Sequence, residues 1–177
     1  MKLQRLSPYA DDTKKVLHVV VETPRGSRNK FTWSEELGAF VLRGTLFAGA
    51  SFPFDFGFVP STLAEDGDPV DVLVLMDESA FAGAIVPSRL VGVIEAEQTE
   101  GDETTRNDRL IAVATASQLY RDVTSLDDLS EALMDGIVHF FVSYNEFKGK
   151  TFTPLGRYSS KRAHALVEEG IRRARRK

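Results

Sequence analysis

The segment EDGDPVDVLVL, residues 65–75, decides the fold of this chain because it joins an acidic turn to a buried strand. Asp66, Asp68 and Asp71 fall close together, and an apolar run follows without a break. Such a run, with no polar alternation, predicts a strand that is covered on both faces. Asp71 stands just inside the run, where an unpaired carboxylate carries a desolvation penalty of several kcal/mol.

The crowding of the three aspartates has two interpretations. DGDP by itself is turn chemistry, so a solvated acidic turn is the simpler one. However, three carboxylates repel one another by about 1 kcal/mol per pair at 4 Å in water, and by roughly 4 kcal/mol at an effective dielectric of 20. A bound divalent cation removes both this repulsion and the desolvation penalty. The acidic turn is therefore a candidate cation site.

The available ligands limit which cation fits. The chain has no Cys and three His, so oxygen ligands favour Mg²⁺, Mn²⁺ or Ca²⁺ over zinc or copper. The EF-hand pattern fails because Gly67 comes second and Pro69 fourth, counting from Asp66. Mg²⁺ usually completes its shell with waters and substrate phosphate, so phosphoryl chemistry is the first enzymatic hypothesis.

Size and composition suit one domain with one core, since 42% of the 177 residues are hydrophobic. The net charge of -4 is unevenly distributed. From Arg157 onward there are eight Lys or Arg against two Glu, whereas the rest of the chain has 14 basic and 24 acidic residues. An acidic body repels the phosphates of nucleic acid, so we expect no nucleic-acid partner.

No segment indicates a membrane partner or an export signal. The longest apolar runs, VLHVVV and DVLVLM, are far shorter than the roughly 20 residues of a membrane span. The N-terminal sequence carries charges and a proline where a signal peptide needs an apolar segment. We therefore expect a cytoplasmic protein.

Hydrophobic patterning predicts strands before helices along the chain. Apolar, β-branched runs predict buried strands, and polar or Gly-containing stretches between them predict turns. The expected strands are 16–23, 30–33 paired with 39–42, 70–76, and 89–97 paired with 109–116 across a loop at 98–108. The aromatic run FPFDFGFVP, 52–60, is expected to be an irregular connection because it contains two prolines and one glycine.

Two helices are expected in the last third. Apolar residues at helical spacing over 125–144 predict the main helix, with Ser125 and Asp128 as a capping box. A second helix from about Ser160 ends in RRARRK, whose cations suit the helix macrodipole. Strands first and helices last indicate an α+β fold with a closed or strongly curved sheet.

Four segments carry a resemblance to a known family. They are ETPRGSRNK at 22–30, FPFDFG at 52–57, DGDPVDVLV at 66–74 and HFFVSYNEFKGK at 139–150. In this order, from about residue 16 to 150, they resemble the soluble family I inorganic pyrophosphatases, for which DGDPVD is close to a signature. The resemblance implies a compact five-stranded closed β-barrel, OB-like, flanked by two main helices.

The resemblance also implies an activity and an organisation. The chain would be a single domain over 1–177, with a core at about 16–150 and a basic C-terminal helix at about 160–177. It would hydrolyse inorganic pyrophosphate to two orthophosphates with a metal-activated water. Several Mg²⁺ ions, or Mn²⁺ in their place, are the implied cofactors, and a homo-oligomer is the implied assembly.

Site roles follow from the resemblance position by position. Asp68 would be the general base, and Lys30 and Arg43 would be catalytic. The implied substrate-binding residues are Lys30, Arg43, Arg109 and Tyr144, and the implied metal ligands are Glu22, Asp66, Asp68, Asp71, Asp102, Asn107 and Asp108. The physics agrees, since metal ions lower the pKa of water and cations neutralise the oxygens whose charge grows during the reaction.

Several positions depart from the family pattern. Asn107 stands where the family has an aspartate, and Asp108 next to it could take the role after a small shift. Arg109 replaces a lysine and keeps its charge, with a fork suited to phosphate. The other changes are Phe52 and Phe56 for tyrosines, Thr32 for a glutamate and Asn145 for a lysine. Losing one hydroxyl donor to phosphate weakens binding or rate about tenfold to a hundredfold.

Other interpretations stay open. Tyr144 also fits the apolar stripe of the helix as a core residue, and Asp102 lies in an acidic loop where a solvated carboxylate is the default. A degenerate pyrophosphatase would have weak activity or another phosphoanhydride substrate. A non-enzymatic binding module would use the basic tail, although no aromatic residues alternate with its cations.

Overall fold

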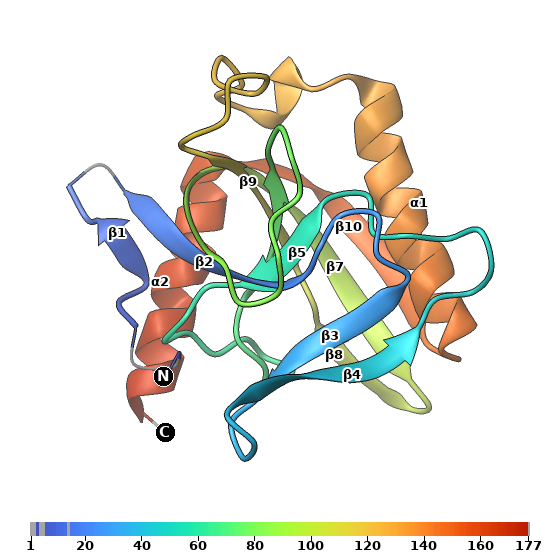
Figure 1. Ribbon diagram of the computed structural model, residues 1–177. Coiled ribbons are helices and arrows are strands. Elements are labelled where there is room, and N and C mark those ends of the chain that lie inside the picture. The colour runs from blue at the N-terminus through green and yellow to red at the C-terminus, as the bar shows by residue number, and fades with distance from the viewer. Residues whose placement is uncertain (1–2, 4–5, 14, 177) are drawn as a thin grey trace.

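The computed structural model describes residues 3, 6–13 and 15–176, and its centre is a ring of five strands (Figure 1). The ring strands are β2 (Val16–Thr23), β5 (Asp55–Phe58), β6 (Asp71–Leu75), β9 (Arg109–Ala114) and β7 (Ile85–Glu100). Each pairs with the next, and β7 pairs back with β2. Only the β6–β9 pair in this ring is parallel. The closed five-stranded sheet implied by the sequence is confirmed.

Other strands extend this ring or stand beside it. β1 (Tyr9–Asp11) pairs with β2, and both β8 (Glu103–Arg106) and β10 (Thr151–Ser159) pair with β7. β3 (Asn29–Ser34) and β4 (Ala39–Thr45) form a separate hairpin, as predicted. This hairpin projects from the barrel at the bottom of Figure 1.

The prediction of an irregular connection at 52–60 was wrong, because β5 occupies its middle and pairs with β2 and β6. Pro53 and Pro60 flank the strand, so neither removes a hydrogen-bond donor from it. Gly57 permits the close approach of β5 to β2. A Cβ atom at Gly57 would lie 2.0 Å from the carbonyl oxygen of Val20.

The predicted loop at 98–108 was also wrong. β7 continues to Glu100, turns at Gly101 and Asp102, and returns as β8. Gly101 has a φ of 59°, a left-handed conformation that suits glycine in a tight turn. This hairpin decides which side chains reach the cleft described below.

Two long helices follow, α1 (Glu131–Phe147) and α2 (Ser160–Arg176). The predicted capping pair of Ser125 and Asp128 caps a short 3-10 helix, η2 (Leu126–Asp128), and not the main helix. α1 starts later because Ser130 is its N-cap, with a side chain that accepts a hydrogen bond from the Leu133 amide. No helix within the described ranges is long and apolar enough to cross a membrane.

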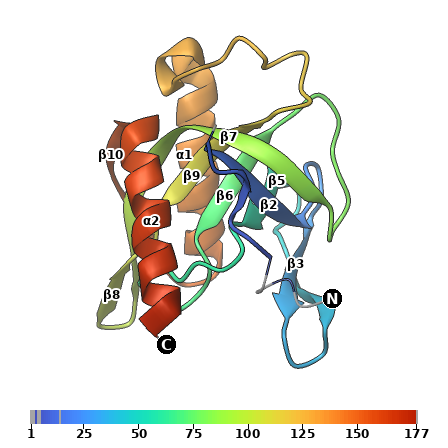
Figure 2. The same ribbon diagram turned by 90° about the vertical axis from the view of Figure 1, so that its left-hand side faces the viewer.

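The core lies on both faces of β6, as its unbroken apolar sequence predicts. Leu73 and Leu75 belong to a buried cluster with α1, whereas Val72 and Val74 belong to a cluster with α2. Successive strand residues point to opposite faces, so the two helices lie over opposite faces of this strand (Figure 2). Packing on both faces holds β6 in place, and β6 in turn holds the acidic turn that directly precedes it.

Candidate active site

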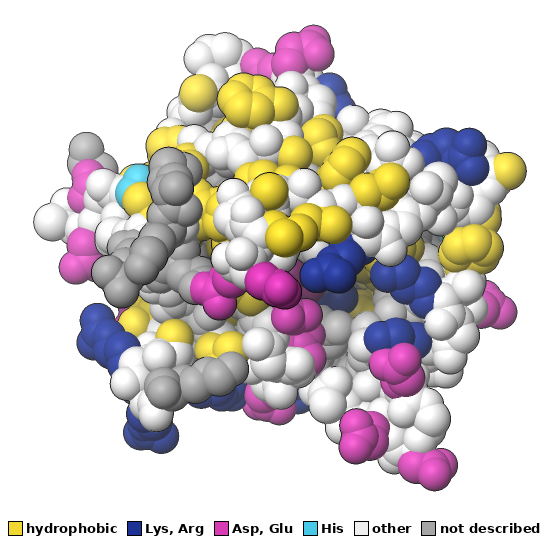
Figure 3. Space-filling view, turned by 60° about the horizontal axis from the view of Figure 1, so that its bottom comes forward, with side chains coloured by type: hydrophobic (Ala, Val, Ile, Leu, Met, Phe, Trp, Pro, Cys, Tyr) yellow, Lys and Arg dark blue, Asp and Glu magenta, His cyan; other side chains and the backbone are white. Residues whose placement is uncertain are grey.

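A cleft of about 1120 Å³ opens between the acidic turn, the β3–β4 hairpin, the β7–β8 hairpin and the C-terminal end of α1. Each of these segments contributes charged side chains to its lining. On the face seen in Figure 3, acidic and basic side chains lie side by side. Most of the residues assigned from the sequence line this one cleft: Glu22, Lys30, Arg43, Asp66, Asp68, Asp71, Asn107, Arg109 and Tyr144.

The acidic turn, residues 66–71, is held by its own backbone. The Ala64 amide donates to the Asp68 carbonyl at 2.7 Å, and the Asp68 amide donates to Asp66 Oδ1 at 3.1 Å. Gly67 has a φ of 90°, which glycine adopts without strain. The turn therefore presents Asp66 and Asp68 to the cleft just before Asp71 enters β6.

Three carboxyl groups in this part of the cleft, those of Glu22, Asp66 and Asp71, have raised pKa values. Burial raises the pKa of Glu22 to about 7, although Lys30 opposes the shift, and the charges of Asp71 and Asp68 add to it. Burial and the charge of Asp71 raise the pKa of Asp66 to about 6. Burial also raises the pKa of Asp71, against the lowering effect of nearby Arg109. These shifts are the electrostatic cost that a bound cation would remove.

Carboxylate oxygens of this kind fit Mg²⁺ or Mn²⁺. Within the described part of the chain, no three His, Asp or Glu side chains are arranged to hold a metal ion by themselves. A cation here would need waters and substrate oxygens to complete its shell, which is the usual situation of Mg²⁺ in proteins.

Two cations of the cleft rest on aromatic rings. Lys30 Nζ lies 4.0 Å from the ring centroid of Phe56 and 3.8 Å from Glu22 Oε2. The Arg109 guanidinium lies 5.0 Å from the ring centroid of Phe141, and its Nη1 donates to Asp71 Oδ2 at 2.6 Å. The cation–π contacts fix both charges in place without neutralising them.

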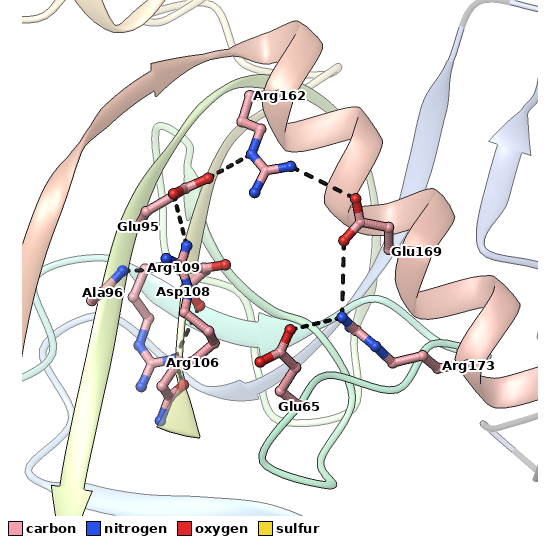
Figure 4. A network of polar contacts seen from close by, with 10 residues as sticks. Glu65, Glu95, Ala96, Arg106, Asp108, Arg109, Arg162, Glu169 and Arg173 are labelled. Atoms are coloured by element: carbon pink, nitrogen blue, oxygen red, sulfur yellow. Dashed lines mark hydrogen bonds and ion pairs between the residues drawn. The ribbon is translucent and has the colours of Figure 1, made fainter. Parts of the chain in front are cut away.

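At the corner where β7, β8 and β9 meet, Asn107 lines the cleft and Asp108 does not. Asn107 Nδ2 donates to Gln98 Oε1 at 3.0 Å, and Asn107 Oδ1 accepts from Arg109 Nη1. Asp108 Oδ1 instead accepts from the Ala96 amide at 3.0 Å, on the other side of the chain (Figure 4). The amide therefore faces the cleft, and the expected shift that would bring in Asp108 does not occur.

Asp102 is likewise not brought to the cleft. It lies in the exposed turn between β7 and β8, outside the residues that line the cleft. The assignment depended on counting five residues back from Asn107, but the hairpin places Gln98 beside Asn107. Gln98 was missed by sequence reasoning, and only the turn residue Gly101 could have indicated a hairpin here.

Arg43 and Tyr144 both line the cleft in different ways. Arg43 is exposed on β4, and its Nε donates to Thr32 Oγ1 at 3.1 Å. Tyr144 is 8% exposed, and its ring stacks on Phe140 with a centroid distance of 5.8 Å. Tyr144 is therefore both a core residue and a residue that lines the cleft.

A chain of alternating charges connects α2 with its neighbouring segments (Figure 4). This charge chain consists of Glu65, Arg173, Glu169, Arg162, Glu95, Arg106 and Asp108, joined by contacts of 2.5–3.9 Å. Burial alone would raise the pKa of Glu95, but hydrogen bonds from Arg106 and Arg162 outweigh it and hold the pKa below its usual value. The charge chain connects the acidic turn, through α2, to the β7–β8–β9 corner.

A closed barrel with a cleft lined by both carboxylates and cations suits an enzyme that acts on a small anion. The chain belongs to the inorganic pyrophosphatase family, which it matches over residues 19–175.

Individual relatives agree over almost the whole chain. The inorganic pyrophosphatase of Corynebacterium efficiens is 39% identical, over 89% of this chain and 97% of that protein, and that of Nostoc sp. is 35% identical, over 89% and 90%. The crystal structure of the Thermus thermophilus inorganic pyrophosphatase is similar with a TM-score of 0.90 at 35% identity, and 99% of each chain is covered. The Helicobacter pylori enzyme gives a TM-score of 0.86 at 33% identity, over 97% of this chain and 99% of that one.

Proposed function

We propose that this protein hydrolyses inorganic pyrophosphate to two orthophosphates with the help of Mg²⁺. The observation that carries the proposal is one cleft lined by the acidic turn together with Lys30 and Arg109, in a chain of this family. Asp66, Asp68 and Asp71, with Glu22 beside them, are the residues that would hold the metal ions. Asp102 and Asp108 are left out of this set because neither lines the cleft.

The cleft residues would accept a proton and stabilise negative charge in this reaction, beside the bound metal ions. Bound Mg²⁺ would supply Lewis acidity and a water of lowered pKa. Asp68 lies exposed at the tip of the turn and can accept the proton that the attacking water loses. As that water adds to one phosphorus, the P–O–P bond breaks and the second orthophosphate leaves. Lys30, Arg43 and Arg109 stabilise the negative charge that grows on the phosphate oxygens.

A phosphate-release assay with pure protein, pyrophosphate and Mg²⁺ tests the proposal. We expect turnover that disappears on chelation of the metal and returns when Mg²⁺ or Mn²⁺ is added back. Parallel assays with tripolyphosphate and ATP address the alternative of another phosphoanhydride substrate. Wild-type protein with no phosphate release above buffer from any of them would sink the enzymatic proposal.

The binding-module alternative depends on the basic tail, and the structure engages part of that segment within the chain. Arg173 pairs with Glu65 and Glu169, and Arg162, near the start of α2, pairs with Glu95. Arg172, Arg175 and Arg176 lie exposed at the end of the helix. Salt-sensitive binding of an oligonucleotide that is lost on deleting residues 172–177 would favour the binding module.

We also propose assembly as a homo-oligomer, which the family resemblance implies, together with a single domain and a cytoplasmic location, which the sequence analysis leads us to expect. Sedimentation of the pure protein measures the assembly. A species at the mass of one chain of 19.6 kDa, at all concentrations, would contradict it.

A further inference from the structure

Lys148 lies at the end of α1 and lines the cleft, although no site role follows for it from the sequence. It is the C-cap residue of the helix, four residues after Tyr144. Its Nζ lies 4.5 Å from the ring centroid of Tyr144. A cation–π contact of this kind limits where the flexible lysine stem places its charge.

The rings beneath the two cleft lysines are neighbours. The ring centroids of Tyr144 and Phe52 are 5.8 Å apart, and Lys30 Nζ lies 5.6 Å from the Phe52 centroid. The ammonium groups of Lys30 and Lys148 thus rest on adjacent rings of one aromatic wall.

Lys148 has no counter-ion in the described parts of the chain, since no carboxylate there lies within 4.0 Å of its Nζ. Lys150, two residues on, differs because its Nζ lies 2.6 Å from Glu100 Oε2. Burial lowers the pKa of Lys30 against the opposing effect of Glu22, and the charges of Arg109 and Lys148 lower it further. Lys148 is therefore close enough to add to the positive potential around Lys30.

Asn145 cannot supply this charge. Its side chain is buried, and its Nδ2 donates to the Phe141 carbonyl within the helix at 2.8 Å. The helix end thus offers the cleft one ammonium without a carboxylate partner, on Lys148.

We propose that Lys148 is a further substrate-binding residue, which holds the phosphoryl group of pyrophosphate nearest to the end of α1. The inference rests on the proposed function, because a phosphate oxygen is the counter-ion that completes the arrangement. Tyr144 has a positioning role, since its ring holds the ammonium over the cleft. Lys148 is exposed, so water screens its charge and its contribution is smaller than that of Lys30.

Steady-state kinetics with pyrophosphate and Mg²⁺ provide the test. For Lys148→Ala we expect KM to rise about threefold to tenfold while kcat stays within about twofold, because the contact is made equally in the ground and transition states. Lys148→Arg restores the charge and should return KM to within about twofold of wild type. The matched control is Lys161→Ala, which removes an exposed lysine of α2 outside the cleft.

Binding of imidodiphosphate, in which P–N–P replaces P–O–P, separates this inference from the proposed function. Calorimetric titration in Mg²⁺ should show the same weakening for Lys148→Ala and none for Lys161→Ala. Unchanged KM and unchanged analogue affinity in Lys148→Ala would overturn the role of Lys148 and leave pyrophosphate hydrolysis untouched. If the wild type binds the analogue but hydrolyses nothing, the proposed activity fails and the titration alone decides on Lys148.

Discussion

The two walls of the cleft are built in different ways. On one wall Asp66, Asp68 and Asp71 come from a single turn, whose backbone hydrogen bonds close within a few residues. The other wall takes Gln98 from β7 and Arg109 from β9, with β8 between them in the chain, and it meets the first wall where Arg109 contacts Asp71. A local turn keeps its geometry wherever it is placed, whereas a wall made of two strands depends on their register.

The walls also differ in charge. The pKa values of Asp66 and Asp71 in the turn are raised, as is that of Glu22 on β2 beside it. The corner presents neutral amides and the guanidinium of Arg109. The first wall suits cations and the second suits an anion, and a substrate that carries phosphate against bound metal needs both. Four substitutions test this division, in order of decreasing expected effect.

Asp71→Asn should have the largest effect. The change removes a carboxylate from the turn and leaves the guanidinium of Arg109 without its charged partner. We expect kcat/KM for pyrophosphate to fall by more than about 100-fold. The matched control is Asp102→Asn at the tip of the β7–β8 hairpin, which should stay within about twofold. A loss in Asp102→Asn as large as that in Asp71→Asn would show that the hairpin tip serves the site after all.

Arg109→Met tests the cationic wall. The side chain keeps its apolar contact with Phe141 but loses the charge that faces the substrate. A fall of about tenfold to a hundredfold in kcat/KM is expected, from the loss of hydrogen bonds between charged partners. Arg109→Lys should recover part of it, because the charge returns without the fork. Activity close to wild type in Arg109→Met would mean that the guanidinium only neutralises Asp71.

Asn107→Asp makes the second wall more like the first. A carboxylate at this position adds negative charge next to Asp71 and the cleft. We expect the Mg²⁺ concentration that gives half-maximal activity to fall about threefold, as each added carboxylate strengthens cation binding. Asn107→Ala is the comparison variant, since it removes the amide without adding charge and should not lower that concentration.

Glu95→Gln tests the charge chain behind the corner. The pKa of Glu95 is lower in the folded protein than in the unfolded chain, so its stabilisation is present above the unfolded value and is lost as pH falls through the folded value. The wild type should lose unfolding free energy below about pH 4.5, and the variant should show a shallower slope there. Denaturant titrations at pH 3 to 7, expected to differ by about 1 kcal/mol at the upper end, provide the measurement. Parallel pH profiles for the two proteins would contradict the assignment.

The sequence predicted the first wall better than the second for physical reasons. Asp71 and the apolar run after it carry their signal within one short segment, and β6 is buried on both faces as that run requires. β8 reads ETTR and carries no apolar alternation, because its residues are partly or fully exposed on both faces. Because β8 was not predicted, Asp102 was assigned to the site by its position in the family pattern. The hairpin that β8 forms with β7 places Asp102 outside the residues that line the cleft.

Two other strands were missed for related reasons. β5 is bounded by prolines, which resemble strand breakers until the bounds are known. β10 contains Pro154 and Gly156, and its pairing with β7 shifts register between them. A bulge hides strand periodicity, since the residues after it change faces. The aromatic wall that holds Lys30 and Lys148 depends on β5, α1 and the loop before β5, so contacts distant in sequence had to be known first.

The position of α2 in the chain sets the order in which the cleft is completed. The Leu63 amide donates to the Gly170 carbonyl at 3.0 Å, and Arg173 pairs with Glu65, so the acidic turn is fastened to the helix that follows every other element. During synthesis on a ribosome, all of the carboxylates and cations of the cleft emerge before that fastening exists. A nascent chain that stops short of α2 would carry the complete set of reactive groups without the support that holds the turn toward the opposite wall. α2 therefore completes the support of the cleft after the segments that carry its charged groups have been synthesised.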